Sequence, residues 1–235
     1  VYGCKEETMV TSIMESSLES SLVKQLLQLP RLATVAQQIE TLLAAEATRR
    51  QRFIATVRES EKAEFINGEK IVQSPARYKH TVVVGNLLYL LSAFVQTHNL
   101  GWVGFEKVMV SLTRNDYEPD ICFFDAATAA GFQPDQMRFP APALMVEVLS
   151  PSTEANDRGV KFDDYAAHGV MEYWIIDPDE EVVEQYRLAG EGYKLAIKAQ
   201  TGELRSVAVS GFVIPVRAIF DAALNRQTLA LLLAS

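Results

Sequence analysis

One short run of residues constrains this chain more than any other, the run LMVEVL from Leu144 to Leu149. A nearly continuous apolar run of this length is typical of a strand buried on both faces of a sheet. A sheet of that kind needs helices on both sides. The same run contains a carboxylate, Glu147, and burying a carboxylate costs free energy unless it is paired, protonated or bound to a metal. The run therefore predicts both a central strand and an unusual site.

The residues around this run predict alternating helices and strands. We expect a hairpin at Asn67-Gly68, because both positions of a two-residue turn need positive φ angles. The other expected elements are a helix over 78–98, strands over 102–112, 120–124, 143–149 and 172–176, a helix over 154–168 ended by Gly169, strands within 181–215 and a helix over 226–233. This order predicts an α/β fold with a central mixed sheet flanked by helices.

Residues 11–58 predict helices that Pro30 interrupts. We therefore expect an N-terminal helical extension over residues 1–58 and one domain over residues 59–235. Leucines cluster in the extension, which favours a homodimer or a higher homo-oligomer. Basic residues gather near its end, among them Arg49, Arg50 and Arg52. They are either a solvated helix face or phosphate contacts for DNA.

The charge balance narrows the possible functions. The chain has 22 basic and 30 acidic residues, a net charge of −8. This acidity argues against a broad basic surface for nucleic acid, but not against phosphate binding through metal ions held by carboxylates. No apolar run approaches the length of a membrane span, and residues 1–10 do not resemble a signal peptide. We expect no membrane partner and a cytoplasmic location.

A second carboxylate, Asp120, immediately precedes another strand that is expected to be buried. If Asp120 and Glu147 lie on neighbouring strands, they raise one another's pKa and create a site for a divalent cation. Taken singly, each could instead reach solvent or an arginine. Lys161 and Tyr165 share one face of the following helix, and Arg158 is expected on the same face. Lys161 is either a surface lysine or a cation that offsets charge on a metal-bound phosphate.

Several segments together resemble the Uma2 family of endonucleases. The resemblance covers roughly residues 50–220 and is carried by these segments: Phe65–Glu69, Ser74-Pro75 with His80, Glu118–Ile121, Val146–Thr153, Lys161, Tyr165, Gly169-Val170 and Glu172–Pro178. The family has the PD-(D/E)xK restriction-endonuclease-like fold, which has an αβββαβ core. The resemblance thus implies this core, with the N-terminal extension and extra C-terminal strands added to it.

The resemblance also implies roles for individual residues. Asp120 matches the aspartate of the first half of the motif, and Glu147 matches the acid of the second half. Leu149 stands where the motif has a lysine, and Lys161 is the lysine that matches this family. Asp120, Glu147 and the carbonyl of Val148 are then expected to hold Mg²⁺ (or Mn²⁺).

Three further residues complete the expected site. By the same resemblance, Tyr165 supports Lys161, Glu69 is an accessory acid and His80 lines the cavity. His80 could equally be a histidine at the helix surface or at the edge of the core. Phosphate contacts are expected from Arg158 as well as from the arginines of the extension.

These roles imply a metal-dependent endonuclease that acts on DNA. One alternative is a catalytically inactive protein that keeps the nuclease fold and binds nucleic acid. Another is an oligomeric interaction protein whose helical extension forms the partner surface. The acidic balance and Leu149 favour an inactive protein, whereas the presence of Asp120, Glu147 and Lys161 together favours the enzyme.

Overall fold

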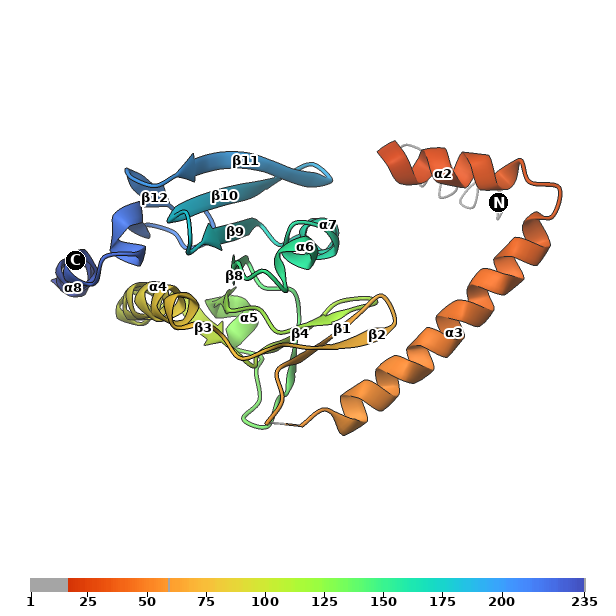
Figure 1. Ribbon diagram of the computed structural model, residues 1–235, viewed down its shortest axis with the longest axis horizontal. Helices are drawn as coiled ribbons and strands as arrows, with labels where there is room; N and C mark the ends of the chain where they lie inside the picture. The colour runs from red at the N-terminus through yellow and green to blue at the C-terminus, as the bar shows by residue number, and fades with distance from the viewer. Residues whose placement is uncertain (1–16, 59, 235) are drawn as a thin grey trace, which may run out of the picture. The chain divides into compact units, whose positions relative to one another are not determined.

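A computed structural model describes residues 17–58 and 60–234, and these residues divide into two compact units, one up to residue 51 and one from residue 52 onward. In the first unit lie α2 (Ser17–Leu27) and most of α3 (Leu32–Thr56) (Figure 1). The interruption expected at Pro30 is confirmed, since α2 ends before it and α3 begins after it. The expected helical residues 11–16 lie outside the described residues. The last turns of α3 belong to the second unit, where Phe53 packs against Phe65 with ring centroids 5.6 Å apart.

The second unit contains the remaining helices and strands. They are β1 (Ala63–Ile66), β2 (Glu69–Val72), α4 (Tyr78–Thr97), β3 (Gly101–Phe105), β4 (Met109–Ser111), β5 (Asp116–Tyr117), β6 (Ile121–Asp125), α5 (Ala126–Ala129), β7 (Arg138–Phe139), β8 (Leu144–Val148), α6 (Glu154–Asp157), α7 (Val160–Ala167), β9 (Glu172–Asp177), β10 (Val182–Ala189), β11 (Gly192–Ala199), β12 (Glu203–Arg205), β13 (Val213–Pro215), a 3-10 helix (Val216–Ile219) and α8 (Ala222–Ala234).

The main sheet has the strand order β11-β10-β9-β8-β6-β3. Strands β8 and β9 are parallel, and the other neighbours in this sheet are antiparallel. Read along the chain, α4, β3, β6, β8, α7 and β9 have the expected αβββαβ order. A second sheet has the order β2-β1-β5-β4-β7, and β12 pairs with β13. The α/β fold with a mixed central sheet is confirmed.

Strand β8 is buried on both faces, as the run LMVEVL predicts. Val146 and Val148 face one hydrophobic cluster, which contains the apolar residues of α4 and Leu232 of α8. Met145 faces a second cluster with Tyr165 of α7 and Tyr173 of β9. Because side chains alternate along a strand, Glu147 points to the same side as Met145. The carboxylate therefore faces the α7 side of the sheet.

Helix α4 supplies much of the first cluster through its buried residues Val83, Val84, Leu87, Leu90, Leu91, Phe94 and Val95. Among the described residues, it is also the one helix whose length and composition would let it cross a membrane. Packing against the sheet accounts for its apolar face, since core helices have the same composition.

The positive φ angles predicted for the turns are observed. Asn67 and Gly68 have φ angles of 50° and 89°, and Gly169, which follows α7, has a φ angle of 75°. Two expected elements are wrong because the backbone breaks inside them. The strand over 102–112 divides into β3 and β4, which belong to different sheets, and Glu106 between them has a φ angle of 60°.

The helix over 154–168 likewise divides into α6 and α7. Gly159 between them has φ −115° and ψ −107°, and a Cβ atom there would lie 2.7 Å from the carbonyl oxygen of Ala155. The break changes which side chains share a face. Arg158 does not continue the face of Lys161 and Tyr165.

Gly101, the first residue of β3, allows a close approach of two backbones. Its φ angle is 144°, and a Cβ atom would lie 2.1 Å from the carbonyl oxygen of Phe124. We expect Gly101→Ala to lower the free energy of unfolding by about 3 kcal/mol or more, because backbone must move on both strands. Urea denaturation followed by circular dichroism measures this loss. Gly192→Ala is the control, since no atom approaches its Cβ position; equal losses in both variants would contradict the argument.

Candidate active site

The two buried carboxylates lie side by side. In the β6–β8 pairing, Ile121 is opposite Val146, so Asp120 and Glu147 occupy the next opposed position. Opposed residues of an antiparallel pair point to the same face of the sheet. Asp120 is 4% exposed and Glu147 is 3% exposed. The structure thus brings together the pair that the sequence singled out.

Asp120 is held by groups from three segments. Its Oδ1 accepts a hydrogen bond of 2.9 Å from Lys62 Nζ, and His80 Nε2 lies 3.4 Å from the same oxygen. Its Oδ2 accepts the N–H of Val148 at 2.8 Å. Burial alone would raise the pKa of Asp120, but the hydrogen bond from His80 and the charge of Lys62 outweigh burial and lower this pKa. Asp120 is therefore a carboxylate at neutral pH.

Glu147 belongs to a second, more deeply buried group. Lys161 Nζ lies 3.0 Å from one carboxylate oxygen each of Glu64, Glu147 and Asp157. The hydroxyl of Tyr165 donates to the same oxygen of Glu147 at 2.9 Å. Lys161 is only 1% exposed, so it is not the surface lysine of the alternative interpretation. Tyr165 touches Glu147, one turn of helix from Lys161.

The charges of this group are unequal, because three carboxylates surround one ammonium. Burial, together with the charges of Asp157 and Asp120, raises the pKa of Glu147 well above its usual range, although Lys161 opposes this effect. Burial disfavours the charged form of Lys161, but the three carboxylates outweigh burial and raise its pKa. Lys161 consequently keeps its proton at neutral pH and does not serve as a base.

The side chains of the site bear on the divalent cation that the resemblance implies. In the described part of the chain, no three His, Cys, Asp or Glu side chains are arranged to enclose a metal ion. Magnesium does not need such an enclosure, because it keeps several waters and takes one or two carboxylates. Asp120 and Glu147 supply two, and a cation between them would offset both the burial of Glu147, which is the main cause of its raised pKa, and its repulsion by Asp120. The residues fit a hydrated Mg²⁺. A ligand role for the carbonyl of Val148 stays a prediction.

Sequence reasoning missed two acids of the site, Glu64 and Asp157. Glu64 lies in β1, where every residue is buried, and it accepts the N–H of Glu118 at 3.0 Å. A carboxylate inside a buried strand is the signal that identified Glu147, so the same signal could have found Glu64. Asp157 is four residues before Lys161. Glu69, the predicted accessory acid, is exposed at the start of β2.

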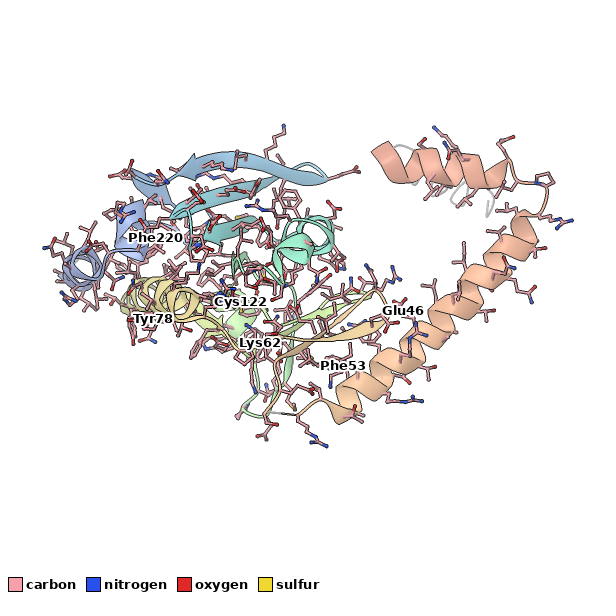
Figure 2. The ribbon with its side chains drawn as sticks, viewed as in Figure 1. Glu46, Phe53, Lys62, Tyr78, Cys122 and Phe220 are labelled. Atoms are coloured by element: carbon pink, nitrogen blue, oxygen red, sulfur yellow. The ribbon has the colours of Figure 1, made fainter. Side chains whose placement is uncertain are left out.

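A cleft of about 520 Å³ opens beside Asp120. Lys62 and His80 line this cleft and also contact Asp120, so the cleft lies next to Asp120, although neither Asp120 nor Glu147 is itself part of the lining (Figure 2 labels Lys62). The other lining residues are 73–77, Lys79, Glu106, 149–153 and 178–179. The hydroxyls of Ser150 and Thr153 lie 2.9 Å apart in this lining. His80 thus occupies the position expected for a cavity-lining residue, and its role stays a prediction.

The predicted phosphate contacts lie elsewhere. Arg158 places Nη1 and Nη2 at 2.7 and 3.2 Å from the carboxylate of Glu184, and its Nε lies 3.0 Å from Glu154. Arg49, Arg50 and Arg52 lie on α3, where Arg49 and Arg52 are exposed and Arg50 is half-buried. The cleft contains none of these four arginines in its lining. Their contact with DNA stays a prediction.

The Arg158–Glu184 pair gives a pH-dependent stability. Burial alone would raise the pKa of Glu184, but hydrogen bonds from Arg158, Lys198 and Tyr186 outweigh burial and lower the pKa to about 2. A carboxyl with a lowered folded-state pKa stabilises the protein above its unfolded value of 4.5, and loses this effect as the pH falls toward 2. We expect Glu184→Gln to lose about 1 kcal/mol at pH 7 and less at each lower pH. Urea denaturation at pH 7, 4 and 3 measures this trend, and a deficit independent of pH would contradict it.

The chain is similar to known proteins both in sequence and in fold. The family Uma2, described as "Putative restriction endonuclease", matches residues 46–217. Two proteins of Synechocystis sp. (strain ATCC 27184 / PCC 6803 / Kazusa) are each 28% identical over 159 residues: "Uncharacterized protein slr1290", with 65% of this chain and 82% of that protein covered, and "Uncharacterized protein sll1609", with 67% and 86% covered. A crystal structure of "a putative nuclease belonging to DUF820" from Anabaena variabilis ATCC 29413 has a TM-score of 0.62 and 19% identity, covering 72% of this chain and 94% of that chain. This likeness confirms the nuclease fold.

Proposed function

Because the chain belongs to the Uma2 family, we propose that it is a metal-dependent endonuclease that hydrolyses DNA phosphodiester bonds. The observation that carries the proposal is the opposed pair of Asp120 and Glu147, buried on one face of the sheet beside a cleft. Two adjacent carboxylates and an ammonium are the groups needed for metal-assisted attack on a phosphate.

In this proposal Asp120 and Glu147 hold Mg²⁺ or Mn²⁺. The bound cation would polarise the scissile phosphate and lower the pKa of an attacking water. Lys62 and His80 keep Asp120 ionised, because their hydrogen bonds favour the carboxylate. Tyr165 orients Glu147 through the hydrogen bond to its Oε1. Lys62 and His80 thus position Oδ1 of Asp120, and Tyr165 positions Oε1 of Glu147.

Lys161 acts as a fixed positive charge. Its pKa is raised by Glu147, Glu64 and Asp157, so it cannot take a proton from water at neutral pH. With a cation held by Glu147, the ammonium of Lys161 would be less tightly paired with Glu147 and would offset charge that develops on the phosphate. The acids Glu64 and Asp157 hold Lys161 in place.

The first test measures metal binding and cleavage together. We expect Mg²⁺ or Mn²⁺ to raise the melting temperature of the metal-free protein, because a ligand that binds only the folded state stabilises it. We also expect nicking of supercoiled plasmid with either cation and none in EDTA. Glu147→Gln should lose both effects, and Glu203→Gln, an exposed carboxylate on β12, should keep both. Metal-independent nicking would contradict the mechanism.

One observation favours the alternative of an inactive nuclease fold that binds nucleic acid. Leu149 stands where the PD-(D/E)xK pattern has its lysine, and it is buried. Lys161 must then supply the charge from α7, where three carboxylates already engage it. Stabilisation by metal without cleavage of supercoiled, linear or single-stranded DNA would support this alternative.

A further inference from the structure

The cleft beside Asp120 bears on the form of DNA that the protein takes. We infer that this cleft binds a single DNA strand in preference to a duplex, an inference that rests on the proposed function. Three observations support it: the burial of the catalytic acids, the small number of cations along the cleft and an exposed tyrosine next to it.

The burial of the acids restricts what can reach them. Asp120 and Glu147 have 4% and 3% of their surfaces exposed and do not line the cleft, but Lys62 and His80 both line it and contact Asp120, so we place the phosphate in the cleft beside them. Its volume of about 520 Å³ is within the range of clefts that enclose small organic molecules. Base pairing ties the two backbones of a duplex together, so neither can enter such a cleft alone. A single strand turns at each nucleotide and can enter.

The cations along the cleft are few. Lys62 and His80 are engaged with Asp120, and Lys79 forms an exposed ion pair with Asp179 that a phosphate can replace. Arg77 is exposed, and no ion pair to it is found among the described residues. Tight duplex binding commonly neutralises several phosphates on a broad surface. The whole chain has a net charge of −8. The few positive side chains along the cleft can therefore pair with the phosphates of a short single strand, but not with those of a long duplex.

Tyr78 provides a surface for a base. It follows the lining residue Arg77 and precedes the lining residue Lys79 in the first turn of α4, and its ring, 86% exposed, stands in solvent outside the cleft lining, where a base of a strand whose phosphate lies in the cleft could stack (Figure 2 labels it). Proteins that bind single strands combine a positively charged groove with aromatic rings on which unpaired bases stack. In a duplex the bases already stack on one another. The ring therefore favours the unpaired form.

The test measures binding without cleavage, using the full-length protein in EDTA at low salt. A fluorescein-labelled 12-nucleotide strand and the same strand in a duplex are compared by fluorescence anisotropy. We expect the single strand to bind about ten-fold more tightly. Tyr78→Ala should weaken single-strand binding about five-fold or more, whereas Tyr78→Phe, which keeps the ring, should bind within about two-fold of the wild type. Arg77→Ala should reduce the slope of log K against log salt by about 0.7.

Equal or tighter duplex binding would overturn the inference, as would Tyr78→Ala binding like the wild type. Plasmid cleavage separates this result from the proposed function. Cleavage without single-strand preference overturns the inference and leaves the nuclease. Single-strand preference with the expected variant effects, but no cleavage with Mg²⁺ or Mn²⁺, supports the inference and overturns the proposed function.

Discussion

Asp120→Asn is expected to lower metal-dependent cleavage by about a thousand-fold or more, because losing a metal ligand removes several kcal/mol of transition-state stabilisation. The asparagine oxygen can still accept the N–H of Val148, so the β6–β8 pairing should remain. The variant removes the charge that Lys62 and His80 face. Lys62 and His80 then have no carboxylate to pair with, and this loss should lower the melting temperature without unfolding the protein.

The measurement is the initial rate of plasmid nicking at saturating Mn²⁺, with circular dichroism to show that the variant is folded. Asp135→Asn is the matched control, because this residue is exposed in the loop before β7. A folded Asp120→Asn protein that nicks plasmid at more than about a tenth of the wild-type rate would remove Asp120 from the metal site.

Lys161→Met is expected to destabilise the protein by about 3–5 kcal/mol, the usual effect of breaking a buried ion pair from one side. Methionine has nearly the same length, but it leaves Glu64, Glu147 and Asp157 without a cation. Glu147 and Asp157, whose pKa values burial already raises, then hold protons in the folded state at pH values where the unfolded chain releases them. Stability of the variant should therefore fall as the pH rises from 5 to 8.

Urea denaturation at pH 5, 6.5 and 8 measures this expected deficit. Adding Glu64→Gln to Lys161→Met should recover part of the loss, because one of the unpaired charges is gone. A deficit below about 1 kcal/mol at pH 8 would show that Lys161 is not the counter-ion of the acids. A destabilisation of this size could by itself abolish cleavage by unfolding the protein. Loss of cleavage in a Lys161 variant says nothing about catalysis until the variant is shown to be folded.

Periodicity and turn residues predicted much of this fold because they act locally. The run around Glu147 identified the central strand, and Asn67-Gly68 identified the hairpin through its φ angles. The backbone break at Gly159 was missed. Glycine within a helical pattern has no side chain to reveal that the backbone leaves the helix there. Arg158 was consequently placed on the wrong face.

Part of the site could likewise be predicted, because some of its residues stand out in the local sequence. Asp120 and Glu147 stood out because each is a carboxylate beside or within an apolar run. Asp157 lies in a polar segment, and only its contact with Lys161 in the folded chain distinguishes it. Lys62 is likewise an ordinary lysine in the sequence, and its bond to Asp120 joins residues 58 positions apart. Contacts between distant segments are not encoded in local patterns.

The distribution of these residues along the chain has a consequence for when the protein can act. Lys62, Asp120 and Glu147 come from three segments, and the N–H of Val148 fixes Asp120 only after β6 and β8 have paired. A nascent or partly unfolded chain therefore presents isolated acids with ordinary affinity for cations. The proposed site is therefore complete only once the sheet has formed.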